Sequence, residues 1–157
     1  MAPKRVLVIR HAEKPNDPYN PDLSETGKQR GRNLAKFIPE RFGVCDFIFA
    51  AAISRHSARP YETVRRLSKT IGIPIDATIS SNDYSVLAQE LVRKPKYEGS
   101  LILICWHHGQ IPPLLHALSA PEGSYPSPWG RNVFDLIMEV KFRDDSVHRV
   151  KEVTQPF

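Results

Sequence analysis

Apolar residues recur along the chain in short runs, and between several of these runs they follow a helical period. The strand-like runs span residues 5–10, 45–51, 100–106, 132–140 and 146–152, with a weaker run at 73–79. The helical spacing predicts helices over residues 24–39, 60–71, 83–94 and 111–119. Strands that alternate with helices favour right-handed crossovers and a mainly parallel sheet with helices on both faces.

The predicted fold is therefore a three-layer α/β/α sandwich with a mixed, mostly parallel sheet. The last two strand-like runs are joined at Asp144-Asp145, which favours a hairpin and hence an antiparallel C-terminal edge. No linker or shift in composition divides the chain, which predicts a single domain over residues 1–157. Two proline-rich stretches, 14–23 and 120–131, are long loops of the kind that is often functional or mobile.

Charge and composition narrow the classes of function. The 22 Lys and Arg exceed the 17 Asp and Glu, but the net charge of +5 is scattered, and Arg65 and Arg66 are interpreted as part of a solvated helix face. Nucleic-acid binding rests on net charge alone, and the first apolar run is too short for a signal sequence or a membrane span. We expect a cytoplasmic protein without nucleic-acid or membrane partners. Cys45 and Cys105 lack the spacing of zinc ligands, so no metal site is predicted.

Basic and histidine side chains follow three of the strand-like runs. These residues are Arg10 and His11 at the end of the run 5–10, Arg59 after the run 45–51, and His107 and His108 after the run 100–106. Ligands of open α/β sheets bind beyond the carboxyl ends of parallel strands, so we expect these side chains to meet at one edge. Arginine presents a planar fork to phosphate oxygens, and a neutral imidazole can attack phosphorus. The pattern favours a phosphoryl group as the ligand.

These residues belong to four motifs that occur in a fixed order. The motifs are RHAE at 10–13, LSETG at 23–27, Ser54 with RPYET at 59–63, and a strand that ends in histidine and glycine. In this order, over nearly the whole chain, they resemble the histidine phosphatase superfamily, also called the phosphoglycerate mutase-like superfamily. The length resembles that of the short, capless bacterial members, including the phosphohistidine phosphatases.

The resemblance implies a phosphohistidine mechanism that needs no metal and no cofactor. His11 would be the nucleophile, while Arg10 and Arg59 would hold the phosphoryl oxygens. Ser54 is a further candidate for phosphate binding, although it stands one residue farther from Arg59 than is common in the family. Arg55 is a candidate to support the phosphate from outside the ring of residues that bind it directly.

Other positions depart from the family pattern. Lys14 stands where the family has serine or threonine, and it would place another cation near the phosphate. No carboxylate clearly matches the proton donor of the family. Glu13 is the closest in sequence, and Asp83 lies in the middle region where the donor is expected.

The second histidine of the family pocket matches either of two positions. The family commonly has isoleucine four positions after it, which selects His107 relative to Ile111. A subset of the family that is similar to this chain has Trp-Glu-His followed by Ile-Pro. Alignment with that motif selects His108 and puts His107 in the place of the glutamate. We prefer His108, because Trp106, Ile111 and Pro112 match that subset without a gap, and we keep His107 as the alternative.

The function expected from the resemblance is a phosphatase that acts on a phosphorylated small molecule or a phosphoprotein. A phosphoglycerate mutase-type phosphotransferase is less favoured, because the chain has little length left for a capping insertion. A non-catalytic phosphate-binding module is the alternative from another class, and the missing proton donor motivates it. Neither the physiological substrate nor the oligomeric state is predicted, because a shared fold does not supply them.

Overall fold

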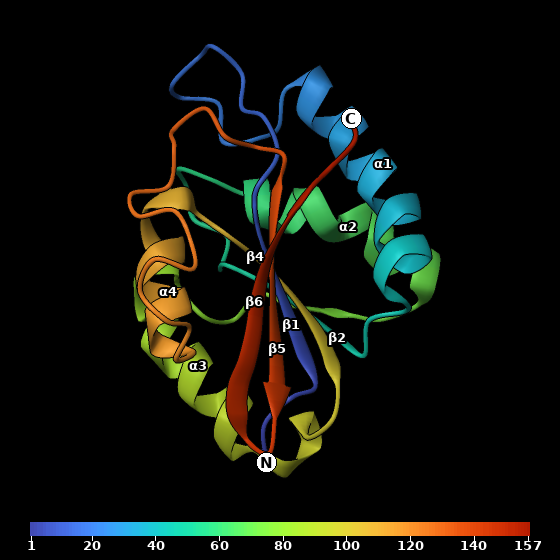
Figure 1. Ribbon diagram of the computed structural model, residues 1–157. Helices are drawn as coiled ribbons and strands as arrows, with labels where there is room; N and C mark the ends of the chain where they lie inside the picture. The colour runs from blue at the N-terminus through green and yellow to red at the C-terminus, as the bar shows by residue number, and fades with distance from the viewer.

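The computed structural model describes residues 1–157, and its strands form one sheet in the order β3-β2-β4-β1-β5-β6 (Figure 1). The strands are β1 (Arg5–Arg10), β2 (Phe47–Ala50), β3 (Ile75–Asp76), β4 (Leu101–Trp106), β5 (Leu136–Arg143) and β6 (Ser146–Thr154). Strands β3, β2, β4 and β1 run parallel, whereas β5 is antiparallel to β1 and to β6. The predicted mixed sheet with an antiparallel C-terminal edge is confirmed.

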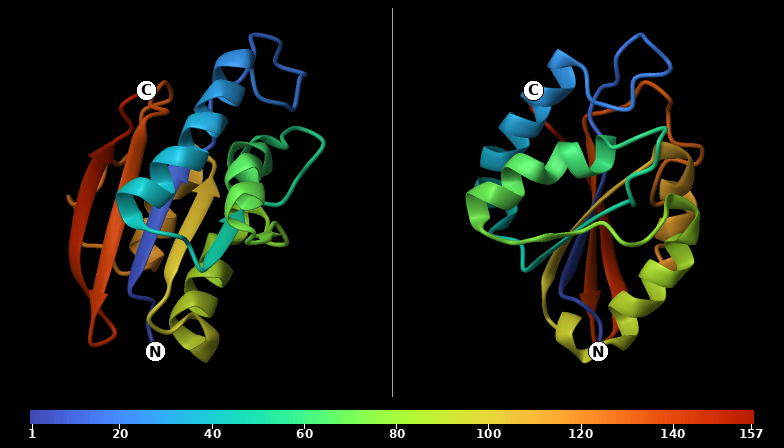
Figure 2. Two further views of the ribbon diagram at one scale, coloured as in Figure 1. Left: turned by 90° about the vertical axis from the view of Figure 1, so that its right-hand side faces the viewer. Right: turned by 180° about the vertical axis from the view of Figure 1, so that it is seen from behind.

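Helices cover both faces of this sheet, as predicted (Figures 1 and 2). They are α1 (Glu25–Phe42), α2 (Arg59–Ile71), α3 (Tyr84–Arg93) and α4 (Ile111–Ala117), with short 3₁₀ turns η1 (Ser81–Asp83), η2 (Pro95–Tyr97) and η3 (His108–Gln110). Successive side chains of β1 point to opposite faces. Val6 and Val8 join the core under α3 and α4, whereas Leu7 and Ile9 join the core under α1 and α2. This explains why the first strand is apolar at four consecutive positions.

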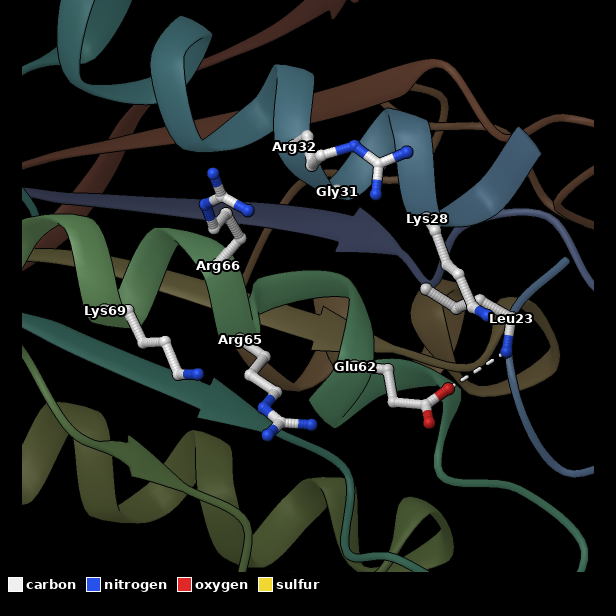
Figure 3. A pocket seen from close by; sticks show the side chains of 8 residues that line it. All are labelled: Leu23, Lys28, Gly31, Arg32, Glu62, Arg65, Arg66 and Lys69. Atoms are coloured by element: carbon white, nitrogen blue, oxygen red, sulfur yellow. Dashed lines mark hydrogen bonds between the residues drawn. The ribbon is translucent and has the colours of Figure 1, made fainter. Parts of the chain in front are cut away.

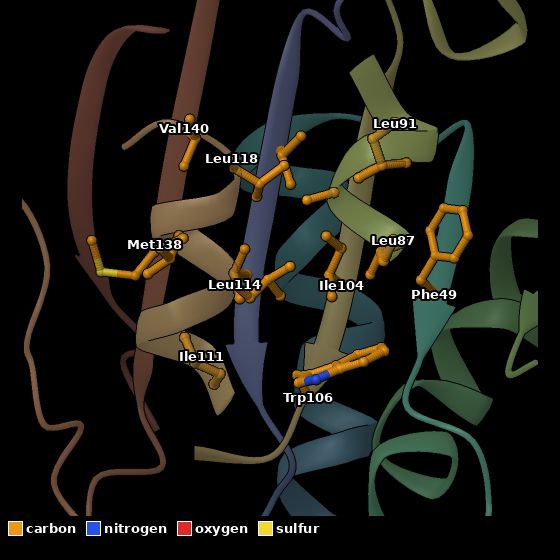
Figure 4. Close-up of a cluster of buried hydrophobic side chains, with 14 of the residues drawn as sticks. Phe49, Leu87, Leu91, Ile104, Trp106, Ile111, Leu114, Leu118, Met138 and Val140 are labelled. Atoms are coloured by element: carbon orange, nitrogen blue, oxygen red, sulfur yellow. The ribbon is translucent and has the colours of Figure 1, made fainter. Parts of the chain in front are cut away.

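The core under α3 and α4 anchors the end of β4 (Figure 4). Trp106, the last residue of β4, is fully buried and lies in the same apolar cluster as Leu87 of α3 and Leu114 of α4. Its indole N–H donates to the carbonyl of Ser81 at 2.9 Å, so the one polar group of the side chain is satisfied. The residues that follow Trp106 therefore leave the sheet from a fixed point.

Two glycines let α1 approach its neighbours closely. The Ser24 hydroxyl caps α1 by accepting from the Gly27 N–H at 3.1 Å. A Cβ at Gly27 would lie 2.3 Å from the carbonyl oxygen of Glu13, and one at Gly31 would lie 3.1 Å from that of Thr63. A larger residue at position 27 would push the segment after β1 away from the helix.

The boundaries differ from the prediction mainly where tertiary contacts compete with local pattern. Strand β5 begins at Leu136 and not near residue 132, because the preceding segment turns back over Arg10, whose side chain donates to the Arg131 carbonyl. Helix α1 continues through Pro39 to Phe42, which is buried. None of the helices has both the length and the apolar character that crossing a membrane requires.

Candidate active site

Strand pairing brings two histidines together at the carboxyl edge of the parallel strands. Arg10 and Trp106 are register partners at the ends of β1 and β4, and the His11 N–H donates to the Trp106 carbonyl at 3.1 Å. His11 and His107 are the residues that directly follow these partners. Their rings meet edge to face with centroids 5.3 Å apart. The first and third strand-end motifs thus meet where ligands of open α/β sheets bind.

Arg10 is buried with two of its N–H-bearing nitrogens unpaired. Its side chain is 1% exposed, Nη1 donates to the Arg131 carbonyl at 2.6 Å, and the guanidinium lies 3.9 Å from the ring centroid of Phe134. Nε and Nη2 are buried and have no hydrogen-bond partner. Burial lowers the pKa of Arg10 to about 10, so the side chain remains charged at neutral pH. Unpaired buried donors on a cation are costly, and an anion placed against them would satisfy both.

His11 is held as a neutral imidazole with a defined orientation. Nδ1 lies 2.7 Å from the carbonyl oxygen of Ala12, which can only accept, so Nδ1 carries the proton and Nε2 carries the lone pair. Burial lowers the pKa of His11 to about 3, and the charges of neighbours including Arg10 and Arg59 act in the same direction. A neutral imidazole with a free lone pair is the form that can act as a nucleophile.

Arg59 begins α2 and faces the same site. Its Nε donates to the Asp22 carbonyl at 3.1 Å and its Nη2 donates to the Asn20 carbonyl, which fixes the guanidinium and leaves Nη1 without a hydrogen bond. Burial lowers its pKa. The charge of Arg59 helps to lower the pKa of both His11 and His107, as expected for a cation close to both rings.

Thr63 and Ser24 hold the segment after β1 in place. The Thr63 hydroxyl accepts from the Ala12 N–H at 2.8 Å and donates to the Arg59 carbonyl at 2.7 Å, which joins the segment after β1 to the first turn of α2. Ser24 donates to the Glu13 carbonyl from its backbone at 3.0 Å and from its hydroxyl at 3.2 Å. The LSETG and RPYET motifs therefore fix the geometry of the segment that follows β1.

The structure places His107, and not His108, beside His11. Burial lowers the pKa of His107 to about 4, and the neighbouring cations Arg59 and Arg10 add to the shift. His108 begins η3 and, together with Pro112, lines a cavity of about 450 Å³ whose lining does not include His11 or His107. His107, the alternative from the sequence, is therefore the histidine whose ring contacts that of His11. His108, the preferred residue, lines the neighbouring cavity instead.

Glu13 forms a two-point ion pair with Arg30. Nε of Arg30 donates to Oε1 at 2.9 Å, and Nη2 donates to Oε2 at 3.0 Å. Arg30 also donates from Nη1 to the Gln155 side chain and the Phe157 carbonyl, both at 2.8 Å. Burial alone would raise the pKa of Glu13, but the hydrogen bonds and charge of Arg30 outweigh it and hold the pKa below its usual value. Glu13 is thus a carboxylate that accepts hydrogen bonds, a poor state for a proton donor.

The other residues proposed from the motifs are exposed. Ser54, Arg55, Lys14 and Asp83 all belong to this group. The Ser54 hydroxyl accepts from two backbone N–H groups of its own turn, so it shapes the loop before α2. Lys14 lies near enough to help lower the pKa of His108, after burial and Arg10. No three His, Cys, Asp or Glu side chains gather as a metal site would require.

Phe134 and Thr63 also belong to the site, although the sequence predicted no role for either residue. Phe134 covers the Arg10 guanidinium and lies 6.2 Å from the His11 ring between centroids. It comes from the loop before β5, where no motif marks it. Thr63 lies inside the RPYET motif. Its hydroxyl stands one helical turn after Arg59, and this spacing is the sequence feature that indicates a contact between Thr63 and the start of α2.

Comparison with known proteins supports the fold suggested by the motifs. The sequence matches no family model and no curated protein. The structure is similar to that of the protein histidine phosphatase SixA complexed with tungstate, at 12% identity over 96% of both chains with a TM-score of 0.69. It is also similar to a mycobacterial glucosyl-3-phosphoglycerate phosphatase, at 14% identity over 97% of this chain and 98% of that one, with a TM-score of 0.64. A phosphoserine phosphatase from Entamoeba histolytica is similar at 17% identity over 97% of this chain and 98% of that one, with a TM-score of 0.61. The chain thus shares the fold of these phosphatases over nearly the whole length of each chain.

Proposed function

We propose that the protein is a phosphatase that transfers a phosphoryl group from a phosphomonoester or phosphoprotein to His11 and then to water. One observation carries the proposal: a neutral, oriented His11 directly follows an arginine with two buried, unpaired donor nitrogens. A phosphoryl group placed against Arg10 would present its phosphorus to the adjacent imidazole. The tungstate in the SixA structure is an oxyanion of the same kind.

In the first step, Nε2 of His11 attacks phosphorus in line with the leaving oxygen. A P–N bond forms and the P–O bond to the leaving group breaks. The phosphoryl oxygens would accept from Nε and Nη2 of Arg10 and from Nη1 of Arg59, donors that are already oriented before the substrate arrives. Donors that need no reorganisation stabilise the charge that develops in the transition state.

In the second step, water attacks the phosphohistidine. The P–N bond breaks, inorganic phosphate leaves, and His11 returns to the neutral form that its burial favours. Ala12 keeps Nδ1 as the protonated nitrogen throughout, so Nε2 is again the nucleophile. Neither step requires a metal or a cofactor.

We assign the role of the second pocket histidine to His107. Its ring contacts that of His11, and it follows the register partner of Arg10. From this position it can bind the same phosphoryl oxygens. His108, on the first residue of η3, would instead contact the part of the substrate that leaves.

The state of Glu13 limits the range of substrates. A carboxylate paired with Arg30 does not readily supply a proton to a leaving group, so we assign Glu13 to positioning the nucleophile segment. Leaving groups of low basicity, such as phenolates, and the imidazole of phosphohistidine depend least on a strong acid. This class includes the substrate type named for SixA, a protein histidine phosphatase.

A panel of phosphorylated compounds tests the proposal. The panel holds p-nitrophenyl phosphate, a phosphohistidine peptide, phosphoserine and 3-phosphoglycerate, each assayed with EDTA on wild type, His11→Ala and His148→Ala. His148 is exposed on β6 and serves as the matched control. We expect wild type and His148→Ala to release phosphate equally and His11→Ala to release none. Unchanged turnover in His11→Ala contradicts the mechanism.

The same panel separates the two alternatives. A non-catalytic phosphate-binding module, which the ionised state of Glu13 favours, would bind phosphate tightly and turn over no compound on the panel. A mutase would interconvert phosphoglycerates faster than it hydrolyses them. Either result would replace the proposed hydrolysis.

A further inference from the structure

A basic groove lies between α1 and α2. Its volume is about 260 Å³, and five cationic side chains line it (Figure 3). Lys28 and Arg32 extend from α1, whereas Arg65, Arg66 and Lys69 extend from α2. The two groups are far apart in the sequence, so the charge pattern of the chain gives no sign of the cluster. Arg65 and Arg66, interpreted from the sequence as a solvated face, are part of this groove.

Acidic side chains do not balance this cluster. Lys28 pairs with Glu25 at 3.2 Å on the surface, and none of the other four cations forms a salt bridge. The one carboxyl in the lining, Glu62, accepts from the Leu23 N–H at 2.9 Å, and burial raises its pKa. Because like charges in one groove repel each other, a bound anion would be more strongly attracted here than to a scattered surface.

The groove is also partly organised. Gly31 allows α1 and α2 to approach closely, since a Cβ at this position would lie 3.1 Å from the Thr63 carbonyl. The Arg32 guanidinium is fixed by Gln29, whose Oε1 accepts from Nε at 3.2 Å and from Nη2 at 3.0 Å. Cations from two helices therefore line one space, and hydrogen bonds fix the guanidinium of Arg32.

We propose that this groove is a second anion site that binds the linked phosphates of a compact polyphosphate. Several adjacent phosphates match several cations in a small volume, and arginine forks suit phosphate oxygens. Arg10, His11 and His107 do not line the groove, so the site is separate from the candidate active site and does not depend on the proposed phosphatase activity. The linked phosphates could belong to inorganic triphosphate or to a nucleotide.

The test is a calorimetric titration of inorganic triphosphate into the His11→Ala protein, in which the proposed nucleophile cannot consume the probe. Two pairs of substitutions are then added separately: Arg65→Gln with Lys69→Gln in the groove, and Arg149→Gln with Lys151→Gln on β6. All four residues are exposed, and both pairs remove the same charge. At about 0.15 M salt, where nonspecific attraction is screened, we expect the groove pair to weaken binding at least about tenfold and the β6 pair less than about twofold.

Backbone amide shifts locate the bound triphosphate. We expect shifts at residues 28–32 and 62–69. Shifts confined to residues 10–13 and 106–109, equal weakening by both pairs, or an absence of binding would each overturn the proposal.

A nucleoside triphosphate titrated in parallel shows where the linked phosphates come from. If it binds as tightly as inorganic triphosphate, the site recognises the phosphate chain alone. If it binds more tightly, the site recognises a nucleotide. An oligoglutamate peptide that binds more tightly than either would show a docking surface for acidic proteins and overturn the assignment.

Discussion

The rings of His11 and His107 meet edge to face, with their centroids 5.3 Å apart. The contact follows from the register of β1 and β4, whose last residues, Arg10 and Trp106, are partners in the parallel ladder. The first residue after each strand therefore reaches the same point at the edge of the sheet. Trp106 is fully buried, so this register cannot slip without opening the core.

The first prediction concerns which histidine shares the pocket with His11. His107→Ala should lower kcat/KM for p-nitrophenyl phosphate by about 100-fold or more, because it removes the ring beside His11 that the proposed mechanism uses to bind the phosphoryl oxygens. His108→Ala should lower it by less than about tenfold, since we propose only leaving-group contacts for this side chain. Steady-state kinetics on the two variants show which histidine acts with His11. A larger loss in His108→Ala than in His107→Ala would instead assign that role to His108, the residue preferred from the sequence.

The second prediction concerns the buried guanidinium of Arg10. Arg10→Lys keeps a positive charge but loses the fork that supplies Nε and Nη2, so kcat/KM should fall by about 100-fold or more. Arg149→Lys, on the exposed face of β6, is the matched control and should behave as wild type. Thermal unfolding of each variant shows whether the loss is one of folding, since Arg10 also bonds the Arg131 carbonyl. Near-normal activity in folded Arg10→Lys would argue against phosphate binding by this residue.

The third prediction separates positioning by Glu13 from proton donation. Glu13→Gln should destabilise the protein by about 1–3 kcal/mol, because it weakens the paired hydrogen bonds to Arg30. It should leave unchanged the slope of log kcat against leaving-group pKa across a series of aryl phosphates. Urea unfolding gives the first quantity and the aryl series gives the second. A steeper slope in Glu13→Gln than in wild type would identify Glu13 as the acid.

The fourth prediction concerns pH. Burial lowers the pKa of His11 to about 3 and that of His107 to about 4, so in phosphate-free buffer the imidazole resonances of both should not titrate between about pH 8 and 5. The unfolded chain binds these protons near pH 6.5 and the folded chain only at lower pH, so the free energy of unfolding falls as the pH is lowered from about 6.5 towards 4. Replacing both residues by asparagine should flatten this decline. Titration of either ring near pH 6.5 would contradict the buried, neutral site.

Much of the fold and the centre of the site could be predicted from local pattern. Strand and helix periods gave the layers and the antiparallel edge, because apolar spacing reflects which face of each element is buried. The rule that ligands bind beyond parallel strand ends placed Arg10, His11 and Arg59 together. Each of these predictions needed only the local pattern of separate segments and a general rule about sheets.

The remaining features depend on contacts between distant segments. Phe134 reaches Arg10 because the loop before β5 folds back over the end of β1, and no local period encodes that path. The partner of Glu13 is Arg30 on α1, so the state of the carboxyl could not be inferred from its neighbours in sequence. The choice between His107 and His108 depended on the register of β1 against β4, which motif spacing alone does not define.

The capture of a phosphoryl group on His11 tests the proposed transfer of phosphate to this residue most directly. Wild type and His11→Ala are mixed with p-nitrophenyl phosphate, quenched in alkali, which preserves phosphohistidine, and digested for mass spectrometry. We expect one added phosphoryl group on the wild-type peptide that contains His11, with release of nitrophenolate, and neither product from the variant. A phosphoryl group on another residue, or steady turnover by His11→Ala, would contradict it.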